Sequence, residues 1–367
     1  MTAADRSSAR VPLRQGGDDR LQSLSGDPLY SAGFLSFADT QLAGRVETHI
    51  YARSEDEWSA AVLGHEYLDR IPLTFHLPSY LNAVDVDVDA DVVGGRWLVL
   101  GTPVRFRSGL LGDPGELARL VDDLVDGARA DGFDGVVVPW VENSSADLCD
   151  MLADAGFQSA FYDADWYFDT GRHDSVEELI ASLPRVPRRN FTNDRKRFEQ
   201  AAITVREFEV GDESDVIAMH AEFMAAYGHP VPEFADSAFA QFAGMGGGTI
   251  EVAVDESGLL LGFVMMLSGA SSGHVLRWGR RQTAVDARIY ANLGYHRPLE
   301  NALRNGVERV WFGKNAHEFK RLRGLTPQPA SVWAKALHPA AESRLSIAMK
   351  EADAAYRARY ERLTGSC

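Results

Sequence analysis

Two parts of this chain show the same order of predicted elements, and this internal repeat limits the folds that are open to it. The first copy covers residues 95–169 and the second covers residues 249–337. In each copy, extended segments lead into an amphipathic helix, an apolar strand, a second helix and a last strand. Strands that alternate with crossover helices predict a mixed α/β (α+β) fold with two tandem domains.

The spacing of apolar residues places the elements of the first copy. Residues 115–130 keep the spacing of a helix with one apolar face. The run GVVVPWV at 135–141 is apolar throughout, as expected of a strand that is covered on both faces. A helix over 146–156 and a strand over 159–169 complete this copy.

The second copy repeats this plan, and two helices, over 175–183 and 187–202, are expected between the copies. Its predicted elements are strands over 249–256, 260–269 and 274–282, a helix over 288–305, a strand over 307–313, a basic helix over 316–324 and a strand over 330–337.

These elements divide the chain into five segments. The first 25 residues are polar and rich in glycine and serine, which is typical of a loose tail. The other predicted segments are a first domain over 26–172, a helical linker over 173–203, a second domain over 204–338 and a C-terminal helical tail over 339–367.

The composition argues against several classes of protein. No apolar run approaches the ~18 residues that a membrane helix needs, and the N-terminus has no apolar core of a secretory signal. The two cysteines, Cys149 and Cys367, do not make a disulfide framework, so we expect a cytoplasmic protein with no membrane partner. His and Cys residues lack the spacing of a metal site, so no metal is expected.

Positive charge is concentrated in two stretches, although the net charge is −16. Residues 185–200 hold six basic residues, and residues 314–323 hold four. The acidic total argues against a general nucleic-acid coat, because phosphate binding needs positive charge. Each stretch is either a solvated helix face or a local site for an anion.

Three stretches resemble one family of enzymes. DADWYFDTGRHDSVEELIASLPRVPRRNFTNDRKRFEQAAITVREF (163–208) is similar to the linker of Fem-type aminoacyltransferases, which build peptidoglycan bridges, and of their GNAT-like relatives. GYHRPLENALRNGVERVWFGKNAHEFKRLRG (294–324) resembles their closing segment, and FHLPSYLNAV (75–84) is a weaker match to an early substrate-facing segment. The resemblance covers about residues 45–340 and rests on the order of several short motifs.

The resemblance implies two tandem GNAT-like acyltransferase domains. Members of the family transfer an aminoacyl group from tRNA, or an acyl group from coenzyme A, onto an amine. We therefore expect peptide-bond formation from aminoacyl-tRNA onto a small-molecule or cell-wall-type amine, without a cofactor. Transfer from acyl-CoA or an acyl carrier protein is the alternative, and a degenerate GNAT protein that binds without catalysis is a third hypothesis.

The glycine pattern bears on acyl-CoA as a co-substrate. A CoA-dependent GNAT domain usually has a glycine-rich turn whose backbone N–H groups hold the pyrophosphate. The second copy reads RRQTAVDARIYANLG at 280–294, with no glycine before its end. The first reads RSGLLGDPG at 107–115, where Gly109 and Gly112 could form such a cradle; a turn with Asp113 as helix N-cap is the other explanation.

Three residues of the second copy are candidates for catalysis. By the resemblance, Lys320 matches a lysine that faces the phosphate or the reacting ester, and we expect it to stabilise the oxyanion. Tyr290 and Tyr295 lie where a GNAT enzyme often has the tyrosine that protonates the leaving group. Packing of the two rings is the alternative.

Further residues are candidates for binding. In the second copy, the basic helix follows the end of a strand, which is where α/β sheets bind ligands. The substrate-binding candidates there are Lys314, His317, Arg323 and Arg277. Those of the first copy, which would line an acceptor pocket, are His76, Tyr80, Arg105 and Arg107. The candidates for contact with the tRNA backbone are Arg188, Arg189, Arg195, Lys196 and Arg197.

Overall fold

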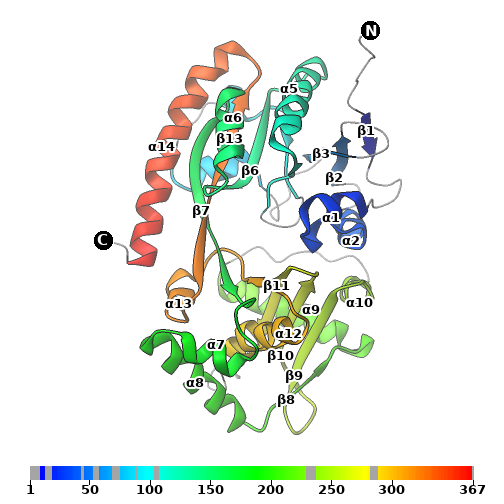
Figure 1. The fold of residues 1–367 in the computed structure, drawn as a ribbon, viewed down its shortest axis with the longest axis vertical. Helices are drawn as coiled ribbons and strands as arrows, with labels where there is room; N and C mark the ends of the chain where they lie inside the picture. Colours follow the sequence, from blue (N-terminus) through cyan, green and yellow to red (C-terminus); the bar gives the residue numbers. More distant parts are fainter. Residues whose placement is uncertain are drawn as a thin grey trace. The chain divides into compact units, whose positions relative to one another are not determined.

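The computed structural model divides the chain into two compact units (Figure 1). Unit 1 contains the described parts of residues 1–25, 30–164 and 328–367, and unit 2 contains those of residues 26–29 and 165–327. The structure describes residues 9–12, 19–42, 45–52, 58–67, 75–86, 90–102, 107–228, 237–281 and 288–365.

Unit 1 is a mixed sheet with helices. Its strand order is β1 (Ala9–Pro12), β2 (Val46–Ala52), β3 (Ala60–Tyr67), β4 (Trp97–Val99), β6 (Gly135–Glu142), β13 (Thr326–Ala336) and β7 (Gln158–Asp169), and β5 (Leu110–Gly112) also pairs with β3. The helices are α1 (Asp19–Ser25), α2 (Ala32–Leu42), α3 (Leu77–Asn82), α4 (Ala90–Val93), α5 (Pro114–Ala130), α6 (Ala146–Asp154) and α14 (Pro339–Thr364).

The sheet of unit 1 is buried on both faces, as the apolar run at 135–141 predicts. Val136 and Val138 of β6 lie in one core cluster with the apolar stripe of α5. Val137, between them, points to the opposite face and lies in a second cluster with Leu345 and Met349 of α14. Figure 1 shows α14 lying along this sheet. Alternate residues of a strand face opposite sides, so β6 needs a cover on each.

Unit 2 has the same kind of sheet. Starting from the end of β7, its strand order is β12 (Arg309–Trp311), β11 (Ser272–Arg280), β10 (Leu260–Ser268), β9 (Gly248–Val254) and β8 (Thr204–Glu207). The helices are α7 (Val176–Ser182), α8 (Arg185–Glu199), α9 (Glu213–Ala226), α10 (Ala238–Ala243), α11 (Ile289–Ala291), α12 (Arg297–Arg304) and α13 (His317–Arg321), with a π-helical segment at Asn292–His296 and short 3₁₀ turns at Pro28–Tyr30 and Val210–Asp212.

The predicted α/β fold with two repeated halves is confirmed, and the two compact units group the predicted segments in another way. The last strand of the second copy, β13, pairs antiparallel with β6 from Ala330↔Glu142 to Ala336↔Gly135 and so belongs to the sheet of unit 1. The last strand of the first copy, β7, continues into unit 2, where Tyr167–Asp169 pair with β12. Such long-range pairing leaves no signal in the local sequence.

Three predicted accessory segments are parts of the two cores. The linker helices α7 and α8 contribute Leu179 and Phe191 to the core of unit 2. The C-terminal helix α14 is no loose tail, because it packs Leu345 and Met349 into unit 1. The N-terminal 25 residues are not wholly loose either, since β1 pairs with β2 and Leu21 of α1 is fully buried. The apolar residues of these helices are spaced among many polar ones, so the sequence does not show which part of the protein they pack against.

Candidate active site

In unit 2, strands β11 and β12 run together and then part. They pair in parallel only at Ser272–His274 with Arg309–Trp311. On that side, the rest of β11 (275–280) has no strand partner among the described residues. A β-bulge lies where they part: Met266 pairs with Val275 and Met265 with Arg277, so Leu276 has no opposite residue on β10. Bulges are frequent next to active sites, because they redirect side chains and free backbone groups.

The helix expected over 288–305 is interrupted beside this parting. It consists of α11, the π-helical turn Asn292–His296 and α12. The Asn292 side chain donates hydrogen bonds to the carbonyls of Arg288 (2.9 Å) and Asp194 (3.1 Å), and so ties the turn to α8. π-helical turns are rare and frequently mark functional sites. Here the extra residue brings two tyrosines together.

Tyr290 and Tyr295 form a hydroxyl pair, with 2.9 Å between their oxygens. Tyr290 stacks on Trp278 of β11 at 3.9 Å between ring centroids, and Tyr295 stacks on Phe312 at 5.0 Å. Phe319 of α13 contacts both tyrosine rings. Tyr295 is 2% exposed, whereas Tyr290 is only partly buried. The pair therefore has one buried and one more accessible member.

Both phenols are protonated at neutral pH. Burial raises the pKa of Tyr290 to about 12, against the opposing effects of the hydrogen bond with Tyr295 and the charges of Arg323 and Arg280. Burial, together with Tyr290, raises the pKa of Tyr295 well above its usual value. The hydrogen bond favours the ionised form of Tyr290 over that of Tyr295, so Tyr290 is the better proton donor of the two.

A buried ion pair lies beside the tyrosines. Arg323 donates to the Asp194 carboxylate at 2.6 Å, and its guanidinium lies over the Phe319 ring at 3.2 Å from the centroid. Asp194 and Arg323 are 5% and 6% exposed. Arg288 approaches the other Asp194 oxygen at 3.7 Å. The arrangement places a fixed positive charge next to two ionisable phenols.

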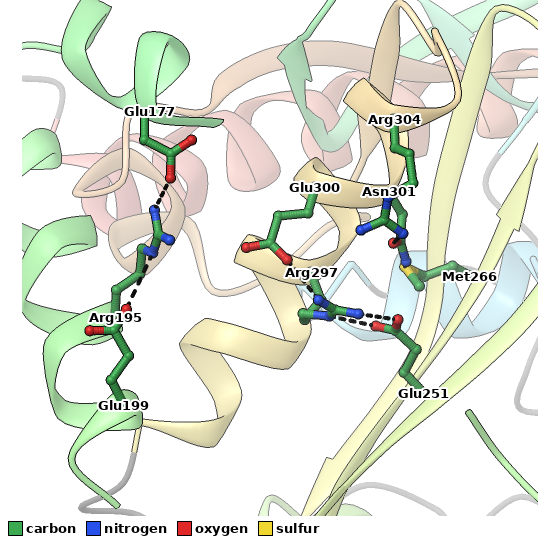
Figure 2. Close-up of polar contacts among 9 residues, drawn as sticks. All are labelled: Glu177, Arg195, Glu199, Glu251, Met266, Arg297, Glu300, Asn301 and Arg304. Carbon is green, nitrogen blue, oxygen red and sulfur yellow. Dashed lines mark hydrogen bonds and ion pairs between the residues drawn. The ribbon is translucent and has the colours of Figure 1, made fainter. Parts of the chain in front are cut away.

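Two ion-pair networks hold the helices around this cluster (Figure 2). Arg297, the first residue of α12, bonds both oxygens of Glu251 on β9 at 2.6 and 3.0 Å and also Glu300 at 2.8 Å. Arg195 of α8 bonds Glu177 of α7 at 2.6 Å. The bidentate pair fixes α12, and with it the π-helical turn, onto the sheet.

The predicted catalytic Lys320 is buried and bonded to the backbone. It is 2% exposed, and its Nζ donates to the carbonyls of Gly313 (2.5 Å) and Lys314 (3.0 Å). Those residues form a turn in which Gly313, Asn315 and Ala316 have positive φ. This placement favours a structural role, in which the ammonium holds a strained turn at the end of β12.

The remaining binding candidates of unit 2 also have partners inside the protein. The buried His317 accepts a hydrogen bond from the Trp166 indole at Nδ1 (3.1 Å). Lys314 is half-buried and offers its carbonyl to Lys320. Arg277 lies 3.3 Å from Nε2 of His220. Burial and the Arg277 charge lower the pKa of His220 to about 3, so this imidazole is neutral.

The candidates of the first copy lie in unit 1, in a structural setting. His76 caps α3 and accepts from the Ser79 amide at 3.3 Å. Tyr80 is buried, donates to the Phe161 carbonyl at 2.8 Å and stacks on Tyr356. The carbonyl of the half-buried Arg107 accepts from the Thr102 amide at 3.1 Å. Arg105 lies outside the described residues.

Of the two explanations for 107–115, the turn with Asp113 as helix N-cap is the one observed, because this stretch is a strand followed by a capped helix. Residues 110–112 form β5, paired with β3. A Cβ at Gly109 would lie 2.2 Å from the Leu63 carbonyl oxygen, so glycine is needed for close packing of two strands. The Asp113 carboxylate accepts from the Gly115 and Glu116 amides, which occupies the helix N-terminus. The corresponding stretch 282–287 of the second copy lies outside the described residues.

Helix α8 presents cations on the side opposite its buried residues. Arg185, Arg189 and Lys196 are exposed and, at spacings of four and eleven residues, lie on one side of the helix. None of the three forms an ion pair within the described part of the chain. Arg185 was not among the predicted tRNA contacts, whereas Arg189 and Lys196 were. Of the remaining predicted contacts, Arg197 is exposed, Arg188 is exposed and donates to the Ala181 carbonyl, and Arg195 pairs with Glu177.

Several residues of this cluster were not singled out from the sequence. Asp194 is one acidic residue in a basic helix, and its burial depends on helix phase relative to Phe191 and Pro187. Asn292 and Phe319 carry no motif. The helical spacing of Pro187, Phe191 and Asp194 is the sequence signal that indicates burial of Asp194. No group of His, Cys, Asp or Glu that could hold a metal occurs among the described residues.

Comparison with known proteins identifies the fold. No protein-family model and no curated protein matches this sequence. The solved structure of FemX matches with a TM-score of 0.63 and 11% identity, over 89% of this chain and 96% of FemX. L-PGS from Bacillus licheniformis matches with a TM-score of 0.53 and 8% identity, over 87% and 95% of the two chains. The C-terminal domain of an Agrobacterium fabrum protein assigned as a lysylphosphatidylglycerol synthetase gives 0.51 and 11%, over 83% and 87%.

These likenesses show that this chain has a fold like those of FemX and L-PGS, as the resemblance implied. No helix in the described ranges is both long and apolar enough to span a membrane.

Proposed function

We propose that this protein is an N-acyltransferase that transfers an aminoacyl group from tRNA to the amine of a small or cell-wall-derived acceptor. The observation that carries the proposal is the Tyr290–Tyr295 pair, which lies at the parting of β11 and β12 beside the buried Arg323. A protonated phenol at this position can donate a proton to a leaving oxygen, which is what breakdown of an ester requires.

The chemistry balances with these residues. The neutral amine nitrogen attacks the ester carbonyl carbon, and a C–N bond forms. The bond from that carbon to the ribose oxygen then breaks. Tyr290 gives its proton to the leaving oxygen, while the Tyr295 hydroxyl stabilises the resulting phenolate. The proton released by the amine nitrogen restores Tyr290, so no net proton is consumed. No metal or other cofactor is needed for this route.

Two observations favour tRNA over acyl-CoA as donor. The exposed cations Arg185, Arg189 and Lys196 form a stripe that suits a phosphate backbone. The glycines at 107–115, which were the better candidate for a pyrophosphate cradle, are used in sheet packing instead. The resemblance to Fem-type aminoacyltransferases points the same way.

The test is discharge of a labelled aminoacyl-tRNA pool by the purified protein, with a low-molecular-weight extract as the amine source. We expect RNase-sensitive, protein-dependent transfer of label to a small product. In the variant R185E/R189E/K196E, transfer at low donor concentration should fall at least tenfold. The slope of log affinity against log salt should become shallower by about 0.7–0.9 for each lost phosphate contact.

The matched control is K350E/R359E/R362E, which makes the same charge change at exposed positions of α14. It should retain transfer and the salt slope. Equal loss in both variants would mean that only net charge matters. No discharge above the spontaneous rate, with transfer from acyl-CoA instead, would replace tRNA by acyl-CoA as the donor. Ligand binding without turnover from any donor would support the non-catalytic hypothesis.

A further inference from the structure

Asp194 joins three elements of unit 2 at one point. It lies on the inner side of α8, 5% exposed. Its carboxylate accepts from Arg323, which follows α13, and lies 3.7 Å from Arg288, which precedes α11. Its backbone carbonyl accepts from Asn292 of the π-helical turn. An exposed ion pair would contribute little to geometry, but a buried and hydrogen-bonded one fixes the position of both partners.

Arg323 transmits this constraint to the tyrosines. Its guanidinium lies over the Phe319 ring, and this ring contacts Tyr290 and Tyr295 at 4.6 and 5.2 Å between centroids. A guanidinium in a buried position requires a carboxylate partner, and Asp194 supplies it at 2.6 Å. Without Asp194, the buried guanidinium would be an unpaired charge, so we expect the Arg323 side chain to move out of the cluster into water.

We infer that Asp194 is a positioning residue for the acyl-transfer step, because it holds the Arg323 guanidinium over Phe319, whose ring contacts the Tyr290–Tyr295 pair. The inference rests on the proposed function, in which Tyr290 donates the proton. Asp194 itself does not contact the reacting atoms in this scheme.

The charges around Tyr290 agree with this role. The groups that affect it are Arg323 and Arg280, which lower its pKa, and Tyr227, which raises it, in addition to the hydrogen bond with Tyr295. Arg323 also acts on Tyr295 in the same direction. If Arg323 moves away, both tyrosines lose the positive charge that stabilises their phenolate forms. Removal of Asp194 should then raise the pKa of Tyr290, although a negative charge has been removed.

The experiment uses the full chain with 3,5-difluorotyrosine at position 290, a phenol whose lower intrinsic pKa allows titration in a mild pH range. The variant is Asp194→Asn, and Asp194→Glu retains the charge with a longer arm in case the first variant does not fold. We expect the absorbance titration to shift upward by about one pH unit in Asp194→Asn and by less in Asp194→Glu. In the transfer assay with aminoacyl-tRNA, kcat should fall about tenfold with KM unchanged.

Two comparisons make the result specific. Asp126→Asn removes an exposed ion pair with Arg129 on α5 of unit 1, and should leave both the titration and kcat unchanged. In an Arg323→Gln background, Asp194→Asn should have no further effect, because Asp194 acts through Arg323. A downward titration shift, or an equal effect of Asp194→Asn with and without Arg323, would overturn the inference. If the wild-type protein transfers nothing, the proposed function fails, while the titration still decides the role of Asp194.

Discussion

At the scale of single residues, the proposed mechanism gives the two tyrosines different tasks, and substitution can separate them. Tyr290→Phe removes the proposed proton donor, so we expect kcat to fall about 100-fold with little change in KM. Tyr295→Phe removes only the hydrogen bond to Tyr290, so the fall should be about tenfold. Steady-state transfer assays measure both. Tyr360→Phe, a phenol of α14 in unit 1, is the control and should have wild-type activity. Equal, small effects of all three would mean that the pair only packs.

A buried histidine makes the stability of the folded protein depend on pH. Burial lowers the pKa of His65 from 6.5 to about 4. Between those values the unfolded chain binds more protons than the folded one, so stability falls as the pH falls from 6.5 towards 4. One such group changes the free energy of unfolding by up to about 1.4 kcal/mol per pH unit.

We therefore expect the free energy of unfolding to fall less steeply between pH 6 and pH 4.5 in His65→Asn than in the wild type. The difference in slope should correspond to close to one bound proton. Denaturant unfolding of both proteins at several pH values measures this difference. Its size depends on how far the variant keeps the hydrogen bonds that His65 makes to the Gly101 carbonyl and the Tyr67 hydroxyl. Parallel pH curves for the two proteins would show that His65 titrates alike in the folded and unfolded states.

The sequence pattern singled out two residues that the structure brings together in the candidate site, and burial sets the positions of the others. Tyr290 and Tyr295 could be singled out because they lie on a recognisable crossover helix. Lys320 matched the family lysine, yet its position is buried and bonded to the backbone, which spacing cannot reveal. Asp194 was hidden because one of two carboxylates in a basic helix suggests a solvated face, and only the phase of the helix puts it inside.

At the scale of elements, β5 offers a direct test of the corrected glycine stretch. Gly112 has φ of +106°, and a Cβ there would lie 2.2 Å from the Ser59 carbonyl oxygen. Gly112→Ala should therefore destabilise the protein by roughly 2–4 kcal/mol. The measurement is the free energy of unfolding in denaturant. Gly127→Ala, in the exposed part of α5 with nothing within 4 Å, should instead stabilise by about 0.5–1 kcal/mol. Normal stability with altered ligand binding in Gly112→Ala would restore the cradle hypothesis.

Helices and strands with strong apolar periodicity were predictable, whereas irregular elements were not. The predicted helix 115–130 is observed as Pro114–Ala130, and the strand 135–141 as Gly135–Glu142. The helix over 288–305 hides a π-helical turn, because an inserted residue does not disturb the composition of the segment. The loop before α5 contains β5, whose pairing with β3 depends on distant residues.

At the scale of the whole molecule, the sequence repeat does not coincide with the folding units. Strand β13 lies between β6 and β7 in the sheet of unit 1, although it follows unit 2 in the chain. A fragment of residues 1–172, which the repeat defines as a first domain, would lack this central strand. It would also lack α14, so the core cluster that contains Val137 of β6 would lose Leu345 and Met349. The apolar pattern of a strand indicates that the strand is buried, but it does not indicate which strand it pairs with.

We therefore expect residues 1–172 alone to lack a cooperative unfolding transition. The same fragment should gain one when residues 326–367 are attached after residue 172 by a Gly/Ser linker, because this segment supplies β13 and α14. Thermal unfolding followed by near-ultraviolet circular dichroism, together with amide NMR dispersion, distinguishes the two constructions. Attachment of residues 175–216, a segment of equal length that contains α7 and α8, is the control and should not restore folding. A cooperative transition in residues 1–172 alone would show that the first copy folds without β13.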